Sequence, residues 1–486
     1  MSTPLRTLTD IRAAERLALA ALPAQALMQR AGQAAAAWIA AHFPATGPVW
    51  VLAGPGNNGG DGWVVAQALA QAGYDALVLC ADPQAPLPPD AAWARQRCLD
   101  TGVPAARAWP GHARPGLIVD ALFGIGLTRP PAAPYEDWIR HCNTAACPVL
   151  SLDVPSGLQG DSGVAFEPAV RATHTLTFLA DKPGLHTADG PDYSGTVVVL
   201  VLDVPVPGRG ALLEPADFAA LWPRRRRNTH KGQFGAVGVL GGSPGMAGAA
   251  LLAAEAALKC GAGRVWLAPL DPALSAAQVA LRCPELMGAT PDALLAQPAL
   301  TALVIGPGLG QSPQAAALLE QALDLPCALV LDADALNLLG GHPAWADRVR
   351  ARGAPTLLTP HPAEARRLLP ETAGMDRVSA ALALASRYRS LVVLKGCGSV
   401  LAEPEGDWWI NASGNAGLSA PGMGDVLAGA LGALLGQGLS PVQALQLAVH
   451  AHGTAADACV AAGRGPLGLT ASEVTDALRQ QLNSRL

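Results

Sequence analysis

The sequence predicts an α/β protein with two domains, each built from a parallel sheet covered by helices. Short apolar runs alternate with helix-length stretches rich in Ala and Leu almost from end to end, as expected where both faces of a parallel sheet are buried. The length of 486 residues exceeds what one hydrophobic core usually organises. A stretch rich in Pro, Gly and Arg separates two series of strands, and we therefore expect domains at 1–213 and 214–486.

Composition narrows the class of protein. Half of the residues are hydrophobic and 15% are charged, with a net charge of −5, which indicates a core-forming globular protein and argues against binding nucleic acid through bulk electrostatics. The nine cysteines contain no CxxC pair, a usage typical of reduced thiols in a cytosol. The N-terminal segment is charged throughout and lacks the apolar core of a signal peptide. We therefore expect a cytoplasmic protein.

One uncharged stretch requires a choice between two structures. No Asp, Glu, Lys or Arg occurs from Val426 to Ala456, a length that could span a bilayer. Gly436, Gly438 and Pro441 interrupt the stretch near its middle, and such residues end helices. Two buried helices joined by a turn are therefore expected, with a membrane span as the alternative.

The strands of the first domain end in polar residues. The strands are expected at 50–54, 76–80, 117–124, 148–154, 173–178 and 197–204. Three of their ends carry the sequences AGPGNNGGDG (53–62), DALFGIG (120–126) and DVPSG (153–157). Ligands of parallel sheets bind outside the carboxyl ends of the strands. We therefore expect a ligand pocket at this rim.

The stretch AGPGNNGGDG is expected to be a strand-to-helix turn that presents backbone amides to an anion. It lacks the Gly-Lys-Ser/Thr of a P-loop and the spacing of a Rossmann G-x-G-x-x-G. Asn57, Asn58 and Asp61 offer oxygens to a hard cation or a ribose. A tight turn with an Asx cap explains the same residues without any ligand.

Together these three motifs resemble those of the NAD(P)H-hydrate epimerase family, in the family's order. The resemblance implies a Rossmann-like three-layer α/β/α domain in which Asp153 is the catalytic carboxylate and Asn58, Asp120 and Ser156 hold a potassium ion. The hydrate is a hemiaminal, so a group that moves protons at its hydroxyl lets the carbon lose and regain its configuration. The implied hydrate-binding residues are Asn57, Asn58, Gly59, Gly60, Asp61, Gly124, Ile125, Gly126, Leu127, Thr128, Arg129, Pro130 and Asp153.

In the second half the alternation restarts with AVGVLGG, RVWLA, ALVIGPG, ALVLDADAL, PTLLTPHP and LVVLKG. Gly422, Gly424 and Asp425 then open a long helix, where amides could hold a phosphoryl group while the carboxylate takes a proton. An Asp that only favours the helix dipole is the alternative. Lys395, at a strand end before Gly396, is well placed to meet phosphate.

These segments, with HKGQFG, IGPGLG, TPHPAEARRLL and LKGCGSVLAEP, resemble the ADP/ATP-dependent NAD(P)H-hydrate dehydratases, relatives of ribokinase-like kinases. The resemblance implies a ribokinase-like α/β/α domain with Asp425 as the base. His361 could instead be a surface residue or a helix cap. Asp332 and Asp334 could help to bind magnesium, but Asp334 could equally cap the following helix. The implied nucleotide-binding residues are Lys395, Gly396, Cys397, Gly398, Ser399 and Gly424, and the implied hydrate-binding residues are Ala249, Gly308, His361 and Asp425.

Both resemblances together imply a bifunctional repair enzyme. The first domain would interconvert the R and S hydrates, and the second would phosphorylate the S hydrate with ADP or ATP and magnesium and then eliminate phosphate. Ser419-Ala420-Pro421 replaces the family's usual threonine-containing segment, a loss of about 1 kcal/mol if one hydrogen bond disappears, so the preference between ADP and ATP stays open. The alternatives are a kinase of a small vitamin-like alcohol with a stable product, and a first domain that only binds a ligand. The expected partners are small molecules and further copies of the chain, with no nucleic acid or membrane.

Overall fold

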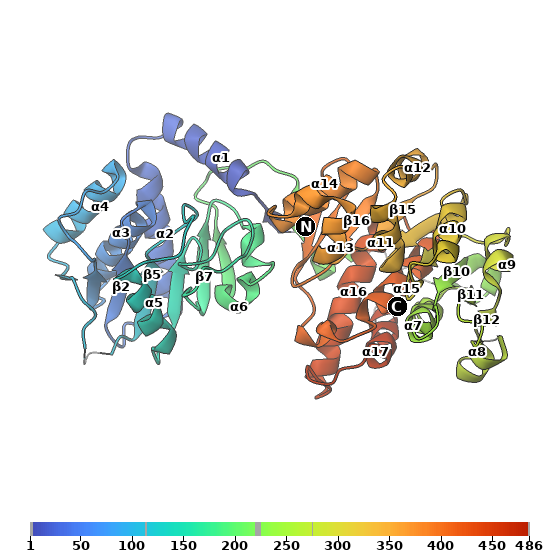
Figure 1. Cartoon of the computed structure of the whole chain (residues 1–486). Helices are drawn as coiled ribbons and strands as arrows, with labels where there is room; N and C mark the ends of the chain where they lie inside the picture. Colours follow the sequence, from blue (N-terminus) through green and yellow to red (C-terminus); the bar gives the residue numbers. More distant parts are fainter. Residues whose placement is uncertain (1–2, 112–113, 219–224, 275, 485–486) are drawn as a thin grey trace. The chain divides into compact units, whose positions relative to one another are not determined.

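The computed structural model, drawn in Figure 1, describes residues 3–111, 114–218, 225–274 and 276–484. The chain divides into two compact units, one containing Pro4–Gly210 and the other containing the described residues from Ala211 onward together with Thr3. Each unit has its own clusters of buried hydrophobic side chains.

The first unit contains a parallel sheet with the strand order β4-β3-β2-β5-β6-β7-β8. The strands of this sheet are β2 (Val49–Ala53), β3 (Ala76–Leu79), β4 (Ala105–Ala106), β5 (Leu117–Ala121), β6 (Val149–Leu152), β7 (His174–Phe178) and β8 (Thr196–Leu200). The short strand β1 (Pro4–Leu5) also belongs to this unit but lies outside the sheet. The helices of this unit are α1 (Leu8–Ala21), α2 (Ala26–His42), α3 (Asn57–Gln71), α4 (Pro89–Asp100), α5 (Tyr135–Thr144), η1 (Pro183–Leu185) and α6 (Gly190–Ser194).

Side-chain alternation along the strands produces the three layers of this unit. In β2, Val49 and Val51 belong to the hydrophobic cluster that includes α2 and α3. Trp50 and Leu52 point to the opposite face and belong to the cluster that includes Trp138 of α5. Because every second side chain points to the same face, helices cover both faces of the sheet, and the predicted α/β/α fold class is confirmed.

The second unit has a larger sheet, in which β18-β17-β16-β15-β14-β13-β10-β11-β12 are neighbours. β9 (Gly210–Leu212) lies at the division between the units. The other strands are β10 (Ala236–Gly241), β11 (Arg264–Pro269), β12 (Met287–Gly288), β13 (Ala302–Ile305), β14 (Ala328–Leu331), β15 (Thr356–Leu358), β16 (Leu391–Leu394), β17 (Ser399–Ala402) and β18 (Trp408–Asn411). The helices are η2 (Pro215–Phe218), η3 (Lys231–Phe234), α7 (Ala247–Lys259), α8 (Ala276–Arg282), α9 (Pro291–Leu295), α10 (Pro313–Ala322), α11 (Asp334–Gly341), α12 (Trp345–Ala351), α13 (Pro362–Leu368), η4 (Pro370–Thr372), α14 (Arg377–Tyr388), η5 (Ala416–Ser419), α15 (Met423–Gly436), α16 (Pro441–Ala461) and α17 (Ala471–Asn483).

The uncharged stretch 426–456 forms parts of α15 and α16, two helices joined by a turn. Side chains of both helices are buried in the core together with α7, α17 and one face of the sheet, and Figure 1 shows these helices gathered on that side of the unit. No helix in the described part of the chain is long and apolar enough to cross a membrane. The prediction of two buried helices is therefore confirmed.

Three local expectations were wrong. Asn57 to Asp61 do not form a turn, because α3 already begins at Asn57 and the turn is confined to Gly54–Gly56. The last strand of the first unit ends at Leu200 rather than at residue 204, because Leu202 and Asp203 adopt positive φ angles that interrupt an extended chain. β17 and β18 pair antiparallel to their neighbours, although the sequence pattern indicated parallel strands throughout.

Candidate active sites

The glycines after β2 allow the first turn of α3 to pack directly on the sheet. A Cβ added to Gly54 would lie 1.7 Å from the carbonyl oxygen of Leu122, and one added to Gly59 would lie 2.0 Å from the carbonyl oxygen of Gly54. Any larger residue would therefore push the helix away from the strand ends. This close packing sets Asn57 and Asn58 at the rim of the sheet.

A cavity of about 690 Å³ lies at this rim in the first unit. Most of the residues that the resemblance implied for hydrate binding line it. Gly59 and Gly60 do not line it, because both are buried within α3, and Pro130 also lies outside the lining. The predicted residues that line the cavity are Asn57, Asn58, Asp61, Gly124, Ile125, Gly126, Leu127, Thr128, Arg129 and Asp153.

Asp153 is held at both carboxylate oxygens. Its Oδ1 forms an ion pair of 2.9 Å with the Nζ of Lys182, and its Oδ2 accepts a hydrogen bond of 3.2 Å from the backbone N–H of Ile125. Asp153 has a φ of +68°, a conformation that aspartate tolerates better than most residues. The carboxylate is therefore oriented by its surroundings, while 13% of the side chain stays exposed.

Lys182 is a site residue that the sequence interpretation missed. Its side chain has no exposed surface, and besides the ion pair its Nζ donates to the Oγ1 of Thr177 (2.5 Å) and the carbonyl oxygen of Phe178 (3.1 Å). A signal was available, because Lys182 is one of only four lysines in the chain and the only one in the first unit. A lysine is almost never fully buried unless it is paired.

Two further carboxylates line the cavity. Burial raises the pKa of Asp61 well above its ordinary value, and the charges of Asp153 and Glu15 raise it further. Burial and the charge of Asp153 also raise the pKa of Glu15, which α1 contributes and which the sequence interpretation did not include. The cavity therefore contains carboxyl groups whose neighbours favour the protonated form.

Asp120 and Ser156 meet directly beneath the rim. The Oγ of Ser156 donates to the Oδ1 of Asp120 (2.6 Å), and the backbone N–H of Ser156 donates to its Oδ2 (2.9 Å). Ser151 and the backbone N–H of Leu122 complete four hydrogen bonds to a carboxylate with no exposed surface. Burial raises the pKa of Asp120, although the hydrogen bonds from Ser156 and Ser151 oppose the increase.

Asn58 differs from Asp120 because its carboxamide has no partner. Its Oδ1 and Nδ2 are both buried and form no hydrogen bond within the described part of the chain. Carbons of the side chain lie 3.4 Å from the Cβ position of Gly124, and the Oγ of Ser156 forms hydrogen bonds with the backbone of Phe123 in the same loop. A buried amide without partners is costly unless a ligand satisfies it.

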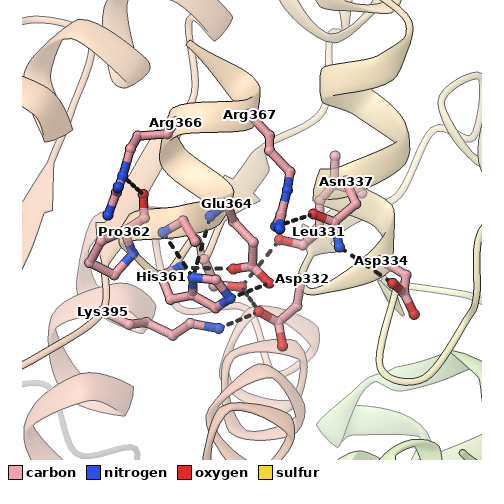
Figure 2. A network of polar contacts seen from close by, with 12 residues as sticks. Leu331, Asp332, Asp334, Asn337, His361, Pro362, Glu364, Arg366, Arg367 and Lys395 are labelled. Atoms are coloured by element: carbon pink, nitrogen blue, oxygen red, sulfur yellow. Dashed lines mark hydrogen bonds and ion pairs between the residues drawn. The ribbon is translucent and has the colours of Figure 1, made fainter. Parts of the chain in front are cut away.

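The second unit contains a buried polar network that joins three strand ends (Figure 2). The Nζ of Lys395, which follows β16, lies 2.6 Å from the Oδ1 of Asp332, which follows β14. The same oxygen accepts a hydrogen bond of 2.6 Å from Thr359 after β15. Burial of Lys395 disfavours its charged form, but the charges of Asp332 and Glu364 outweigh this effect and raise its pKa above the ordinary value.

His361 begins α13 as its N-cap residue. Its Nδ1 accepts hydrogen bonds from the backbone N–H groups of Ala363 and Glu364, so the ring proton is on Nε2, which lies 3.3 Å from the Oε1 of Glu364 (Figure 2). His361 therefore caps α13, as the alternative interpretation expected, while 48% of its side chain stays exposed and can meet a ligand. Glu364, which the sequence interpretation missed, is buried, and burial raises its pKa although Lys395 opposes the increase.

Asp425 lies in the first turn of α15, next to this network. Gly422, with a φ of +85°, is the N-cap residue of the helix. A Cβ added to Gly424 would lie 3.2 Å from the Nζ of Lys395 and 3.9 Å from the Oδ2 of Asp332. Burial and the charge of Asp332 raise the pKa of Asp425 to about 7, against the opposing effect of Lys395. A carboxylate with such a pKa suits proton transfer at neutral pH.

The other predicted residues of this unit lie in α7, at the start of α11 and in the loops after β13 and β16. Gly308, with a φ of +59°, packs against Ala249, whose Cβ is 3.2 Å from the Cβ position of Gly308. Asp334 does not cap α11, because its Oδ2 accepts the backbone N–H of Gly310 instead. After Lys395 the loop Gly396–Ser399 turns back through a hydrogen bond between the Gly396 N–H and the Ser399 Oγ (3.2 Å), with Cys397 exposed between them.

The architecture defines the class of protein: a Rossmann-like α/β/α domain fused to a ribokinase-like α/β/α domain. Residues 237–480 match the family model described as NAD(P)H-hydrate dehydratase, and residues 24–184 match the model described as YjeF-related protein N-terminus.

The chain is 38% identical to the bifunctional NAD(P)H-hydrate repair enzyme Nnr of Coxiella burnetii, over 98% of each chain, and 38% identical to that of Escherichia coli, over 98% of this chain and 93% of the other. The chain belongs to the family of bifunctional NAD(P)H-hydrate repair enzymes.

A solved structure supports the assignment of the second unit. The ADP/ATP-dependent NAD(P)H-hydrate dehydratase of Bacillus subtilis, co-crystallised with ATP and Mg²⁺, is 29% identical to this chain, with a TM-score of 0.50. The match covers 57% of this chain and 98% of the Bacillus protein. These comparisons do not favour the alternative of a kinase acting on a small vitamin-like alcohol.

Proposed function

We propose that the first unit interconverts the R and S forms of NAD(P)H hydrate and that the second unit converts the S form back to NAD(P)H while consuming ADP or ATP. The proposal depends on one observation. The chain is similar to repair enzymes over 98% of its length, and each unit has an acidic side chain held by its neighbours at the end of a strand or at the start of a helix. Asp153 and Asp425 are these two side chains.

In the first unit, Asp153 is the group that moves the proton at the hydroxyl of the hydrate. Lys182 and the N–H of Ile125 orient its carboxylate, which lines the cavity and is therefore held in one orientation toward a bound substrate. When the carboxylate takes the hydroxyl proton, the bond between the carbon and the ring nitrogen breaks, the hydroxyl oxygen becomes an aldehyde oxygen, and the nitrogen takes up a proton. Attack of the nitrogen on either face of the aldehyde, with return of the proton to the oxygen, then closes the ring in either configuration. Glu15 and Asp61, whose pKa values are raised by burial and by the charge of Asp153, line the same cavity and would contact the bound hydrate.

The residues of the first unit fit a potassium ion. The carboxamide oxygen of Asn58 accepts no hydrogen bond from the described residues, and Ser156 and the carbonyl of Phe123 lie together beside the Asn58–Gly124 contact. No group of three His, Cys, Asp or Glu side chains in the described ranges is arranged to bind a metal, so amide, hydroxyl and carbonyl oxygens would dominate the ligands, with Asp120 nearby. A bound potassium ion would supply positive charge for the pyrophosphate of the substrate.

In the second unit, Asp425 takes the proton of the hydrate hydroxyl as its oxygen attacks the terminal phosphorus of the nucleotide. The new O–P bond forms while the bond to the leaving nucleotide breaks, and backbone amides of Gly422–Gly424 stabilise the phosphoryl oxygens. The C–O bond then breaks with the electron pair of the ring nitrogen assisting, phosphate leaves, and loss of a proton from the neighbouring carbon restores the dihydronicotinamide. Lys395 neutralises phosphate charge.

The acidic groups near Lys395 also fit a magnesium–nucleotide complex. Asp332 and Asp334 come from the end of β14 and the start of α11, Glu364 comes from α13, and all three raise the pKa of Asp425 through their charges. The nucleotide phosphates would supply most of the ligands, as is usual for magnesium. Bound magnesium would neutralise charge that develops between the phosphates.

Conversion of a mixture of R and S hydrates by the full chain tests the proposal. With ATP or ADP, Mg²⁺ and K⁺, the absorbance of reduced nicotinamide is expected to recover for both forms. In Asp153→Ala, rapid recovery is expected to stop once the S form is consumed, because acid/base catalysis contributes about a hundredfold or more. No recovery with the wild-type chain, or full recovery with Asp153→Ala, would contradict the proposal. Homo-oligomerisation remains part of the proposal, and light scattering of the purified chain tests it.

A further inference from the structure

The segment between β18 and α15 carries the chain into the proposed phosphoryl-binding turn. After Asn411 it passes through Ser413 and Gly414, forms the short helix η5, and reaches Gly422, the N-cap of α15. Gly414 has a φ of +107°, so the backbone turns sharply at the start of the segment. The position of the Gly422–Gly424 amides therefore depends on how this segment is held.

Asp457 of α16 holds the segment with both carboxylate oxygens. Its Oδ2 accepts a hydrogen bond of 2.8 Å from the backbone N–H of Gly414. Its Oδ1 accepts a hydrogen bond of 2.9 Å from the Nδ2 of Asn415. In the described part of the chain, no ion pair joins Asp457 to a basic side chain, so its charge is directed to these two neutral donors. Hydrogen bonds to a charged acceptor are stronger than those between neutral groups.

Asn415 passes this restraint on to η5. While its Nδ2 is bound to Asp457, its Oδ1 accepts a hydrogen bond of 3.0 Å from the backbone N–H of Gly417, and Asn415 is the N-cap residue of η5. The two ends of one carboxamide thus connect α16 to the short helix. Pro421, between η5 and Gly422, limits the remaining freedom of the segment.

Further contacts come from the same face of α16. Gly453 lies so close to the segment that an added Cβ would be 2.2 Å from the Oγ of Ser413 and 2.7 Å from its carbonyl carbon. The Oγ of Ser413 also donates to the carbonyl oxygen of His450 (3.1 Å). Residues 450, 453 and 457 are spaced as neighbours along one helix face, so a continuous surface of α16 supports the segment.

We propose that Asp457 is a positioning residue for phosphoryl transfer in the second unit. It is not among the residues proposed to contact the nucleotide or the hydrate; it holds the segment that leads to the Gly422–Gly424 amides and Asp425. Such groups must be held to within about half an ångström to be productive. This inference rests on the dehydratase activity proposed above and deepens it, because it assigns a role to α16, which contributes none of the proposed contacts.

The test compares Asp457→Ala, Asn415→Ala and the double variant with the wild-type full chain. Nucleotide-dependent dehydration is measured at a temperature where a thermal melt shows each variant folded, and kcat is separated from the KM for the hydrate. We expect kcat to fall about tenfold or more in each single variant, with a smaller change in KM. The double variant is expected to be no slower than the slower single variant, because Asp457 acts through the segment that Asn415 holds.

Asp457→Asn and Asp476→Asn complete the design. In Asp457→Asn the asparagine can accept only one of the two hydrogen bonds and turns a donor toward the other N–H, so we expect kcat to lie between the values of the wild type and of Asp457→Ala. If Asp457→Ala does not fold, the kcat of Asp457→Asn tests the role of Asp457. Asp476 of α17 forms an ion pair of 2.9 Å with Lys259 but is half exposed, and its variant is expected to keep wild-type kcat. Wild-type kcat in a folded Asp457 variant, or multiplied losses in the double variant, would overturn the role of Asp457. An inactive wild-type chain would instead contradict the proposed function.

Discussion

Replacement of Lys182 by methionine tests whether a buried ion pair orients the carboxylate of the epimerase site. Methionine has nearly the length of lysine but carries no charge and no donor. The change removes the partner of Asp153 at 2.9 Å and leaves Thr177 Oγ1 and two backbone carbonyl oxygens without the donor they share. The Lys182 side chain has no exposed surface, so water cannot easily replace it.

The expected cost follows from this burial. Removing one partner of a buried ion pair usually destabilises a protein by about 3–5 kcal/mol, because the remaining charge stays buried without compensation. Asp153 keeps 13% of its side chain exposed, so we expect a loss at the lower end, about 3 kcal/mol. Epimerisation is expected to fall about a hundredfold or more, because the carboxylate loses its orientation.

Lys259→Met is the matched control. Lys259 forms an ion pair of the same length, 2.9 Å, with Asp476, but the two side chains are 27% and 49% exposed. Exposed pairs contribute about 0.2–1 kcal/mol. Hydrogen exchange in increasing denaturant, read on peptides from each unit, measures both free energies of unfolding, and the conversion of R hydrate to S hydrate measures the epimerase.

Equal stability losses in the two variants would refute the argument that burial decides the strength of these ion pairs. Normal epimerisation in a folded Lys182→Met chain would refute the orienting role of Lys182. A large loss of epimerisation in Lys259→Met would show that the assay responds to disturbance outside the first unit.

Three further predictions follow from individual side chains. Because the pKa of Asp425 is about 7, the rate of dehydration should rise with pH through that value. Between about pH 4 and pH 7 the folded chain keeps the proton of Asp425 whereas the unfolded chain has lost it, so the free energy of unfolding should fall as the pH rises through this range. Asp425→Asn should abolish both trends, as measured by rate and denaturation assays. Gly124→Ala places a Cβ 2.9 Å from the Oδ2 of Asp153 and should impair epimerisation. Gly111→Ala, outside the lining of the cavity, meets no atom within 4 Å and should not impair it; equal rates would contradict the proposed site. Asn58→Leu removes a buried amide that forms no hydrogen bond among the described residues, so it should stabilise the chain by about 1–3 kcal/mol in potassium-free buffer. Epimerisation and its response to potassium should be lost in this variant. A less stable variant would mean that the amide is satisfied.

The strand ends were predictable because local patterns and a general rule were sufficient. Uninterrupted apolar runs mark strands buried on both faces, and parallel strands present their carboxyl ends at one edge. From this, Asp120 and Ser156 were expected near each other, and the structure joins them by a hydrogen bond of 2.6 Å. Their roles as potassium ligands stay a prediction.

Partners from distant segments could not be read from local pattern. The pairing of β5 with β6 places Ser151 opposite Asp120, and the order of β14, β15 and β16 brings Lys395 to Asp332 across 63 positions of the chain. A single sequence contains no information on strand order or register beyond its hydrophobic pattern. The rarity of lysine in a chain with only four could have directed attention to Lys182.

The sequence by itself determined which segments form strands and helices, where glycines permit close packing, and which family the motifs resemble, because these depend on neighbouring residues along the chain. Only the tertiary structure decided that Lys182 holds Asp153, that the carboxamide of Asn58 is buried without a hydrogen bond among the described residues, and that burial beside Asp332 raises the pKa of Asp425 to about 7. The physical reason is that solvation and charge interactions depend on the distances between groups in space, and folding sets those distances between residues that lie far apart in the chain.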